Sequence, residues 1–139
     1  MYKITKKFEN FDGVEQSEDF FFNMTESELI GRASSNHGDF ITLMKKVFRE
    51  KDQGKLLELF EELVLMAYGV KSADGKHFYK SEEIKNDLKS HAAFSDIYIA
   101  LATNQAEATA FIKGIMPKKY ADQINLDMSE SEIEKLIES

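Results

Sequence analysis

The sequence predicts a mainly α domain of the α+β class: about five to six helices that follow an N-terminal β-hairpin and precede a C-terminal helical tail. Three observations support this prediction. Apolar residues alternate with polar ones near the start, they recur at helical spacing through the middle, and the end is polar and acidic. We therefore expect one globular domain over 1–117, with the hairpin over 1–23 and helices over 24–117, and an acidic tail with a short helix over 118–139.

The hairpin is predicted from alternation at period two. Tyr2, Ile4 and Phe8 fall on one face of the first strand, and Phe20 and Phe22 share a face of the second. The stretch over 9–13 is typical of a turn, because its final glycine tolerates a positive φ. An isolated hairpin is only marginally stable in water, so we expect it to lie on the helices or to pair with another chain.

Two aromatic residues of the hairpin lie outside its predicted apolar face. Phe11 lies in the turn, and Phe21 points away from the face that carries Phe20 and Phe22. Either both rings pack locally, or they form an exposed edge that binds a β-rich partner. Phe11 and Phe21 are therefore candidate partner-binding residues.

A capping box marks the start of the helical part. Thr25 and Glu28 have the spacing of this motif, and Met24 is positioned to pack on Leu29 as a hydrophobic staple. The pattern predicts a short helix to about residue 33, broken by the stretch over 34–38.

Two apolar stripes predict the next helices. The first is amphipathic, with apolar residues from Phe40 to Phe48, and we expect residues 52–54 to end it. The second runs over 56–67 and has the fewest polar positions. We expect it to be the central buried helix, with Phe60 and Leu63 in the core.

Residues 68–117 contain turns and caps between three further helices. Gly69 directly follows the central helix, so we expect it to end that helix with a positive φ. Residues 72–75 have good turn chemistry, and Ser81 is a candidate cap for a helix to about residue 90. Apolar stripes then predict helices over 94–101 and 108–115, and Pro117 prevents easy continuation of the last one.

The acidic tail carries a second helix-start signature. Its pattern predicts a helix over 130–138 with one apolar side, too short to be stable alone, which either docks or becomes ordered on meeting a partner. The apolar residues on that side, which are also candidate partner-binding residues, are Ile133, Leu136 and Ile137.

Composition and motifs exclude several function classes. A net charge of −7 argues against a nucleic-acid-binding protein, and the absence of cysteine excludes disulfide and thiol chemistry. We expect no signal peptide and no membrane span, hence a cytoplasmic protein. His37, His77 and His91 lack metal-ligand spacing, and no nucleophile or phosphate-loop motif is present. We therefore predict no enzyme, no metal site and no cofactor.

The ordered spacing of the central third resembles one family, the tail assembly chaperones of long-tailed bacteriophages. The resemblance rests on a helix that runs into a Tyr-Gly pair, an Asp-Gly turn, a capped acidic helix start, and a last apolar helix followed by proline. The residues that carry this structural motif are Tyr68, Gly69, Asp74, Gly75, Phe78, Ser81 and Pro117.

The resemblance implies a non-enzymatic cytoplasmic factor that is absent from the virion. Such a protein binds the tape measure protein and, through a frameshifted longer product, recruits tail tube subunits. Two alternatives remain: a virion component such as a tail completion protein, and an adaptor or regulatory module of host origin. Of the two candidate client surfaces, we favour the tail over the hairpin, because a marginal helix is easily released.

Overall fold

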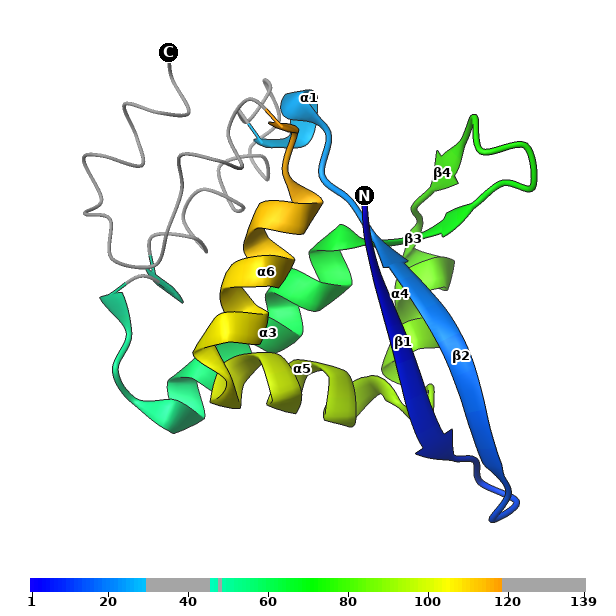
Figure 1. Ribbon diagram of the computed structural model, residues 1–139, viewed down its shortest axis with the longest axis horizontal. Helices are drawn as coiled ribbons and strands as arrows, with labels where there is room; N and C mark the ends of the chain where they lie inside the picture. Colours follow the sequence, from blue (N-terminus) through cyan, green and yellow to red (C-terminus); the bar gives the residue numbers. More distant parts are fainter. Residues whose placement is uncertain (30–45, 48, 119–139) are drawn as a thin grey trace.

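A four-stranded antiparallel sheet packs against a group of helices in the computed structural model, which describes residues 1–29, 46–47 and 49–118 (Figure 1). The sheet has the order β1-β2-β3-β4. Its strands are β1 (Tyr2–Glu9), β2 (Glu15–Phe22), β3 (Tyr68–Lys71) and β4 (Phe78–Tyr79). The helices assigned within these ranges are α1 (Glu26–Leu29), α3 (Gln53–Ala67), α4 (Glu82–Lys89), α5 (Phe94–Thr103) and α6 (Gln105–Ile115). The predicted α+β class is therefore confirmed as a mixed α+β fold, while the expectation that helices dominate it is not confirmed.

The predicted N-terminal hairpin is confirmed. β1 and β2 pair antiparallel from Tyr2 opposite Phe22 to Glu9 opposite Glu15, and Gly13 in the turn has φ 79°. Helices α3, α5 and α6 lie together on one side of this hairpin (Figure 1). The Phe22 ring meets Phe111 of α6 edge-on, with 5.3 Å between the ring centroids. Of the two expected arrangements, packing on the helices or pairing with another chain, the structure shows packing on the helices.

The predicted central helix is α3, and its buried face is the expected one. Phe60, Leu63, Val64 and Ala67 are all buried. One boundary differs from the prediction. The Asp52 side chain accepts hydrogen bonds from the Gly54 and Lys55 N–H groups, so this stretch starts α3 as its N-cap.

The three later helices are also confirmed. The Ser81 hydroxyl oxygen accepts an N–H group in the first turn of α4. The Asn104 side-chain amide oxygen does the same in the first turn of α6. Helix α6 ends at Ile115, shortly before Pro117. These helices complete a core whose largest fully buried side chains are Phe20, Phe22, Phe111, Leu63, Leu88, Ile97, Ile112 and Ile115.

The β3–β4 hairpin was not part of the predicted fold. The turn between its strands was predicted. In that turn Gly75 has φ 75°, and the Asp74 carboxylate accepts a hydrogen bond from the Ser72 hydroxyl at 2.6 Å. The two strands are too short to show alternation, and β3 is held by pairing with β2, opposite Phe21 and Phe22. Only the fold brings these partners together.

The expectation of a positive φ at Gly69 is wrong. Among the described residues, the glycines with positive φ are Gly13 and Gly75. The chain leaves α3 through Tyr68 in extended conformation, so Gly69 already belongs to β3. A side chain at Gly69 is disfavoured for another reason, because the Phe78 ring and the Tyr79 carbonyl oxygen occupy the space that a Cβ would need.

Several predictions fall on residues outside the described ranges. They are most of the helix over 40–51, the end of the first short helix, the packing of the Leu29 side chain, and the whole tail helix. The division at residue 117 likewise remains a prediction. Within the part of the chain that the structure describes, no helix is long and apolar enough to cross a bilayer.

Candidate functional site

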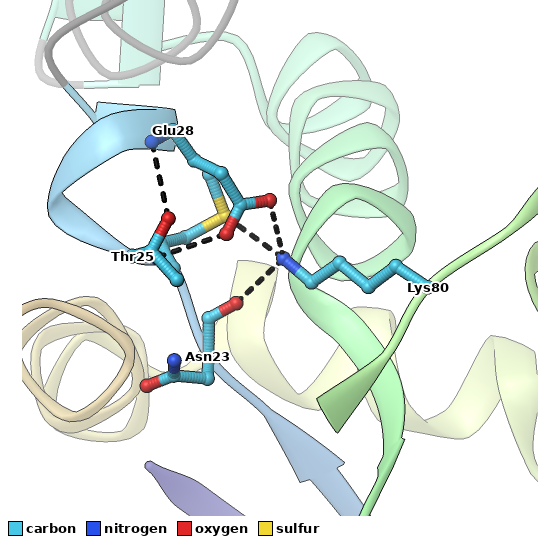
Figure 2. A network of polar contacts seen from close by, with 5 residues as sticks. Asn23, Thr25, Glu28 and Lys80 are labelled. Carbon is cyan, nitrogen blue, oxygen red and sulfur yellow. Dashed lines mark hydrogen bonds and ion pairs between the residues drawn. The ribbon is translucent and has the colours of Figure 1, made fainter. Parts of the chain in front are cut away.

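The link between the sheet and α1 contains a network of polar contacts around Lys80. The Lys80 ammonium donates to the Asn23 carbonyl oxygen at 2.7 Å and to Glu28 Oε2 at 2.8 Å, and it lies 3.6 Å from the Met24 sulfur (Figure 2). An ammonium group has three donors and no acceptor. Its hydrogen-bonding capacity is therefore satisfied in this position.

Glu28 serves both this ion pair and the predicted capping box. Its Oε1 accepts the Thr25 N–H at 2.9 Å, while the Thr25 hydroxyl accepts the Glu28 N–H at 3.2 Å (Figure 2). The capping box is thus confirmed. Burial raises the pKa of the Glu28 carboxyl, but the bonds from Lys80 and Thr25 outweigh this effect and hold the pKa below its ordinary value. Burial lowers the pKa of Lys80, and attraction to Glu28 offsets only part of that shift.

Backbone bonds tie the same link to two helix ends. The Asn23 N–H donates to the Ala67 oxygen at the end of α3, and the Met24 N–H donates to the Ile115 oxygen at the end of α6. With Lys80 just before α4, this junction holds the C-terminal ends of two helices and the start of a third. Its role is structural, because the Lys80 ammonium, the Glu28 carboxylate and the backbone groups named above are all bonded inside the fold.

The outer face of the sheet, defined by Lys3, Phe21, Lys71 and Phe78, carries the first surface candidate. Register places Lys3 opposite Phe21 and Lys71 opposite Phe78. Phe21 is half-buried, with the Lys71 ammonium 5.8 Å from its ring centroid. Phe21 therefore does pack locally, and it also contributes to a partly exposed patch that combines aromatic rings with positive charge.

The hairpin tip is the second surface candidate. Phe11 is 86% exposed and Val14 is 54% exposed. The tip projects away from the helices (Figure 1). Because Phe11 and Phe21 lie at opposite ends of the hairpin, the structure does not bring these two candidates into one site. The remaining candidates, Ile133, Leu136 and Ile137, lie outside the described residues.

His91 has a role that the sequence prediction missed. Its Nδ1 accepts the Ala93 N–H at 3.0 Å, and its Nε2 lies 3.1 Å from Glu18 Oε1. The ring also meets Phe8 and Phe20 edge-on, each with 4.9 Å between centroids. His91 thus fastens the loop before α5 to the hairpin, a contact across the chain that no local pattern indicates.

A groove beside β1 was also missed. It has a volume of about 260 Å³ and lies between the first strand and helices α5 and α6. A larger groove, of about 550 Å³, lies where α3, α5 and α6 meet, with Leu56, Phe60 and Ala108 among its lining residues. No sequence signal specifies these grooves, because each is formed by residues from separate elements.

The described residues present surface features rather than a cluster of metal-ligating side chains. Within the described ranges, no three His, Asp or Glu side chains lie close enough together to hold a metal ion. What these residues do present is exposed aromatic side chains, open strand edges and grooves lined by both polar and apolar residues. These features are typical of a protein that binds other proteins.

Comparison with known proteins agrees with this interpretation. A family model described as phage tail assembly chaperone matches residues 1–138. No curated protein and no solved structure matches the chain significantly. The family match covers almost the whole chain, including the hairpin, the helices and most of the tail. The resemblance inferred from the sequence is thereby confirmed, and the chain belongs to the phage tail assembly chaperone family.

Proposed function

We propose that this chaperone acts without catalysis in the host cytoplasm, where it binds the tape measure protein and helps to recruit tail tube subunits. The observation that carries the proposal is the family match over residues 1–138. The exposed Phe11, the aromatic patch around Phe21 and the grooves beside the helices support it, because an assembly factor needs surface that is free to bind a client.

The charge of the chain suits this task. A long client with exposed apolar surface aggregates unless a partner covers that surface and prevents the complexes from associating with one another. The net charge of −7 provides such repulsion.

The acidic tail remains the favoured client-responsive segment. Its apolar residues Ile133, Leu136 and Ile137 would cover an apolar groove in the free protein and leave it when a client helix binds. The groove between α3, α5 and α6 supports this exchange, because Leu56, Phe60 and Ala108 give part of its lining an apolar character.

Co-expression with the tape measure protein of the same phage tests the proposal. We expect the tape measure protein to stay soluble and to co-purify with the full-length chain, and to be insoluble without it. Equal insolubility with and without the chain would refute client binding. Recovery of the chain from purified virions would favour a tail component instead.

Deletion of residues 121–139 tests the role of the tail. We expect the shortened protein to melt cooperatively, with altered affinity for tape measure segments or altered self-association. If it unfolds, the tail belongs to the core. If it folds and binds unchanged, the hairpin becomes the better candidate surface.

A further inference from the structure

The edge of β1 is open for strand addition. The Asn10 N–H donates to the Val14 oxygen at 2.8 Å. This pair continues the register in which Phe8 lies opposite Gln16, so it shows which residues of β1 bond to β2. Hydrogen-bonded pairs alternate along an antiparallel ladder, so the even-numbered residues of β1 exchange bonds with β2. The N–H and C=O groups of Lys3, Thr5 and Lys7 therefore point away from β2. In the described part of the chain, no strand adjoins β1 on that side.

A groove lies beside this open edge. Residues 2–6 of β1 form one wall. Ile97, Ala100 and Leu101 of α5 contribute apolar side chains to the lining, and Glu107 of α6 contributes a carboxylate. Its volume of about 260 Å³ leaves room for an aliphatic side chain of an added strand. At the start of β1 the Tyr2 ring packs against Gly114 of α6, which closes the sheet against the helices there. The open stretch therefore begins beyond Tyr2.

The charge along β1 selects the kind of strand that fits. Lys3, Lys6 and Lys7 lie on this strand, and no ion pair involves them among the described residues. Lysines on an edge strand disfavour pairing with a second copy, since two such edges would bring like charges together. The same lysines attract an acidic segment.

We propose that the client adds an extended acidic segment to the open edge of β1. Side chains of an added strand alternate between two faces. Those on the helix side are apolar and enter the groove lined by Ile97, Ala100 and Leu101, while those on the outer face are acidic and lie near Lys3 and Lys7. The inference rests on the proposed function, because it takes the tape measure protein to be the client.

A matched pair of substitutions at Thr5 tests the backbone contact. Thr5→Pro and Thr5→Val both remove the hydroxyl that donates to Asp19 at 2.7 Å, but only proline also removes the N–H at the open edge. Proline is tolerated on edge strands, and thermal melts would check the fold of both variants. We expect Thr5→Pro to bind the tape measure protein about tenfold more weakly than Thr5→Val. Equal binding by the two variants would overturn the proposal.

Hydrogen exchange on the full-length chain gives a direct readout. The amide protons of Lys3, Thr5 and Lys7 should exchange quickly in the free protein and slowly in the complex. Slow exchange in the free protein would mean that the edge is already occupied, either by another part of the chain or by a second copy, and would overturn the proposal.

Charge reversal and peptide probes test the acidic preference. Lys7→Glu should weaken client binding several-fold more than Lys76→Glu, which makes the same charge change in the exposed β3–β4 turn. A heptapeptide that alternates glutamate with valine should bind better than its lysine counterpart, and equal binding would count against the site. If the acidic peptide protects the edge amides but the tape measure protein does not bind, the edge assignment is supported and the proposed function is overturned.

Discussion

Replacing Gly69 by alanine is a sharp test of how the sheet is packed. A Cβ built on Gly69 would lie 2.5 and 2.7 Å from Cε2 and Cζ of the Phe78 ring and 2.8 Å from the Tyr79 carbonyl oxygen. The ring can turn aside, but the carbonyl belongs to β4, whose position is set by pairing with β3. The added methyl group therefore forces the two strands apart or displaces the ring.

The expected cost follows from two opposing terms. Overpacking of this kind costs about 1–3 kcal/mol, while replacing glycine in a strand recovers about 0.5–1 kcal/mol of backbone entropy. We expect Gly69→Ala to lower the free energy of unfolding by about 1–2 kcal/mol in urea titrations. Gly75→Ala is the matched control, because its Cβ meets nothing within 4 Å although its φ is 75°. Its cost of about 1 kcal/mol comes from backbone conformation alone.

A double-mutant cycle with Phe78→Ala separates the two causes. Removing the ring removes two of the three close contacts of the added methyl group, so Gly69→Ala should cost less in the Phe78→Ala background, by about 0.5 kcal/mol or more. Gly75→Ala should show no such coupling. Additive effects at Gly69 and Phe78, or a Gly69→Ala protein as stable as the wild type, would refute the close packing described above.

Two further substitutions test the core and the junction at α1. Leu63→Ala should destabilise the fold by about 2–5 kcal/mol, because Leu63 is 0% exposed in α3; a loss below about 1 kcal/mol in chemical denaturation would contradict its place in the core. Because the pKa of Glu28 is held below 4.5, its charged form stabilises the fold above that pH, and the contribution disappears as the pH falls through the lowered value. Glu28→Gln should thus cost about 1 kcal/mol near neutral pH and progressively less in acid, and a constant difference from the wild type down to about pH 3 would argue against the ion pair with Lys80.

Local patterns in the sequence determined the hairpin, the helix starts and the buried stripes. The alternation around Phe20 and Phe22 and the stripe through Phe60 and Leu63 report which face is buried, because each element repeats with its own period. Helix caps such as Ser81 form hydrogen bonds to residues only a few positions away, so the sequence predicts them too. The same logic placed Phe11 in the turn, but only the structure shows that its ring is exposed rather than packed locally.

The tertiary structure alone decided the features that join distant residues. β3 is a strand because Gly69 pairs with Phe21, and Lys80 is held by Glu28, 52 positions away. The groove beside β1 exists because α5 and α6 pack near an edge strand without filling the space along it. Propensity and periodicity act over a few residues, whereas pairing, close approach and cavity shape depend on which surfaces the packed core brings together. That difference in range is why the sequence predicted the first hairpin and most of the described helices of this chaperone, while the β3–β4 hairpin, the grooves and the open edge emerged only from the fold.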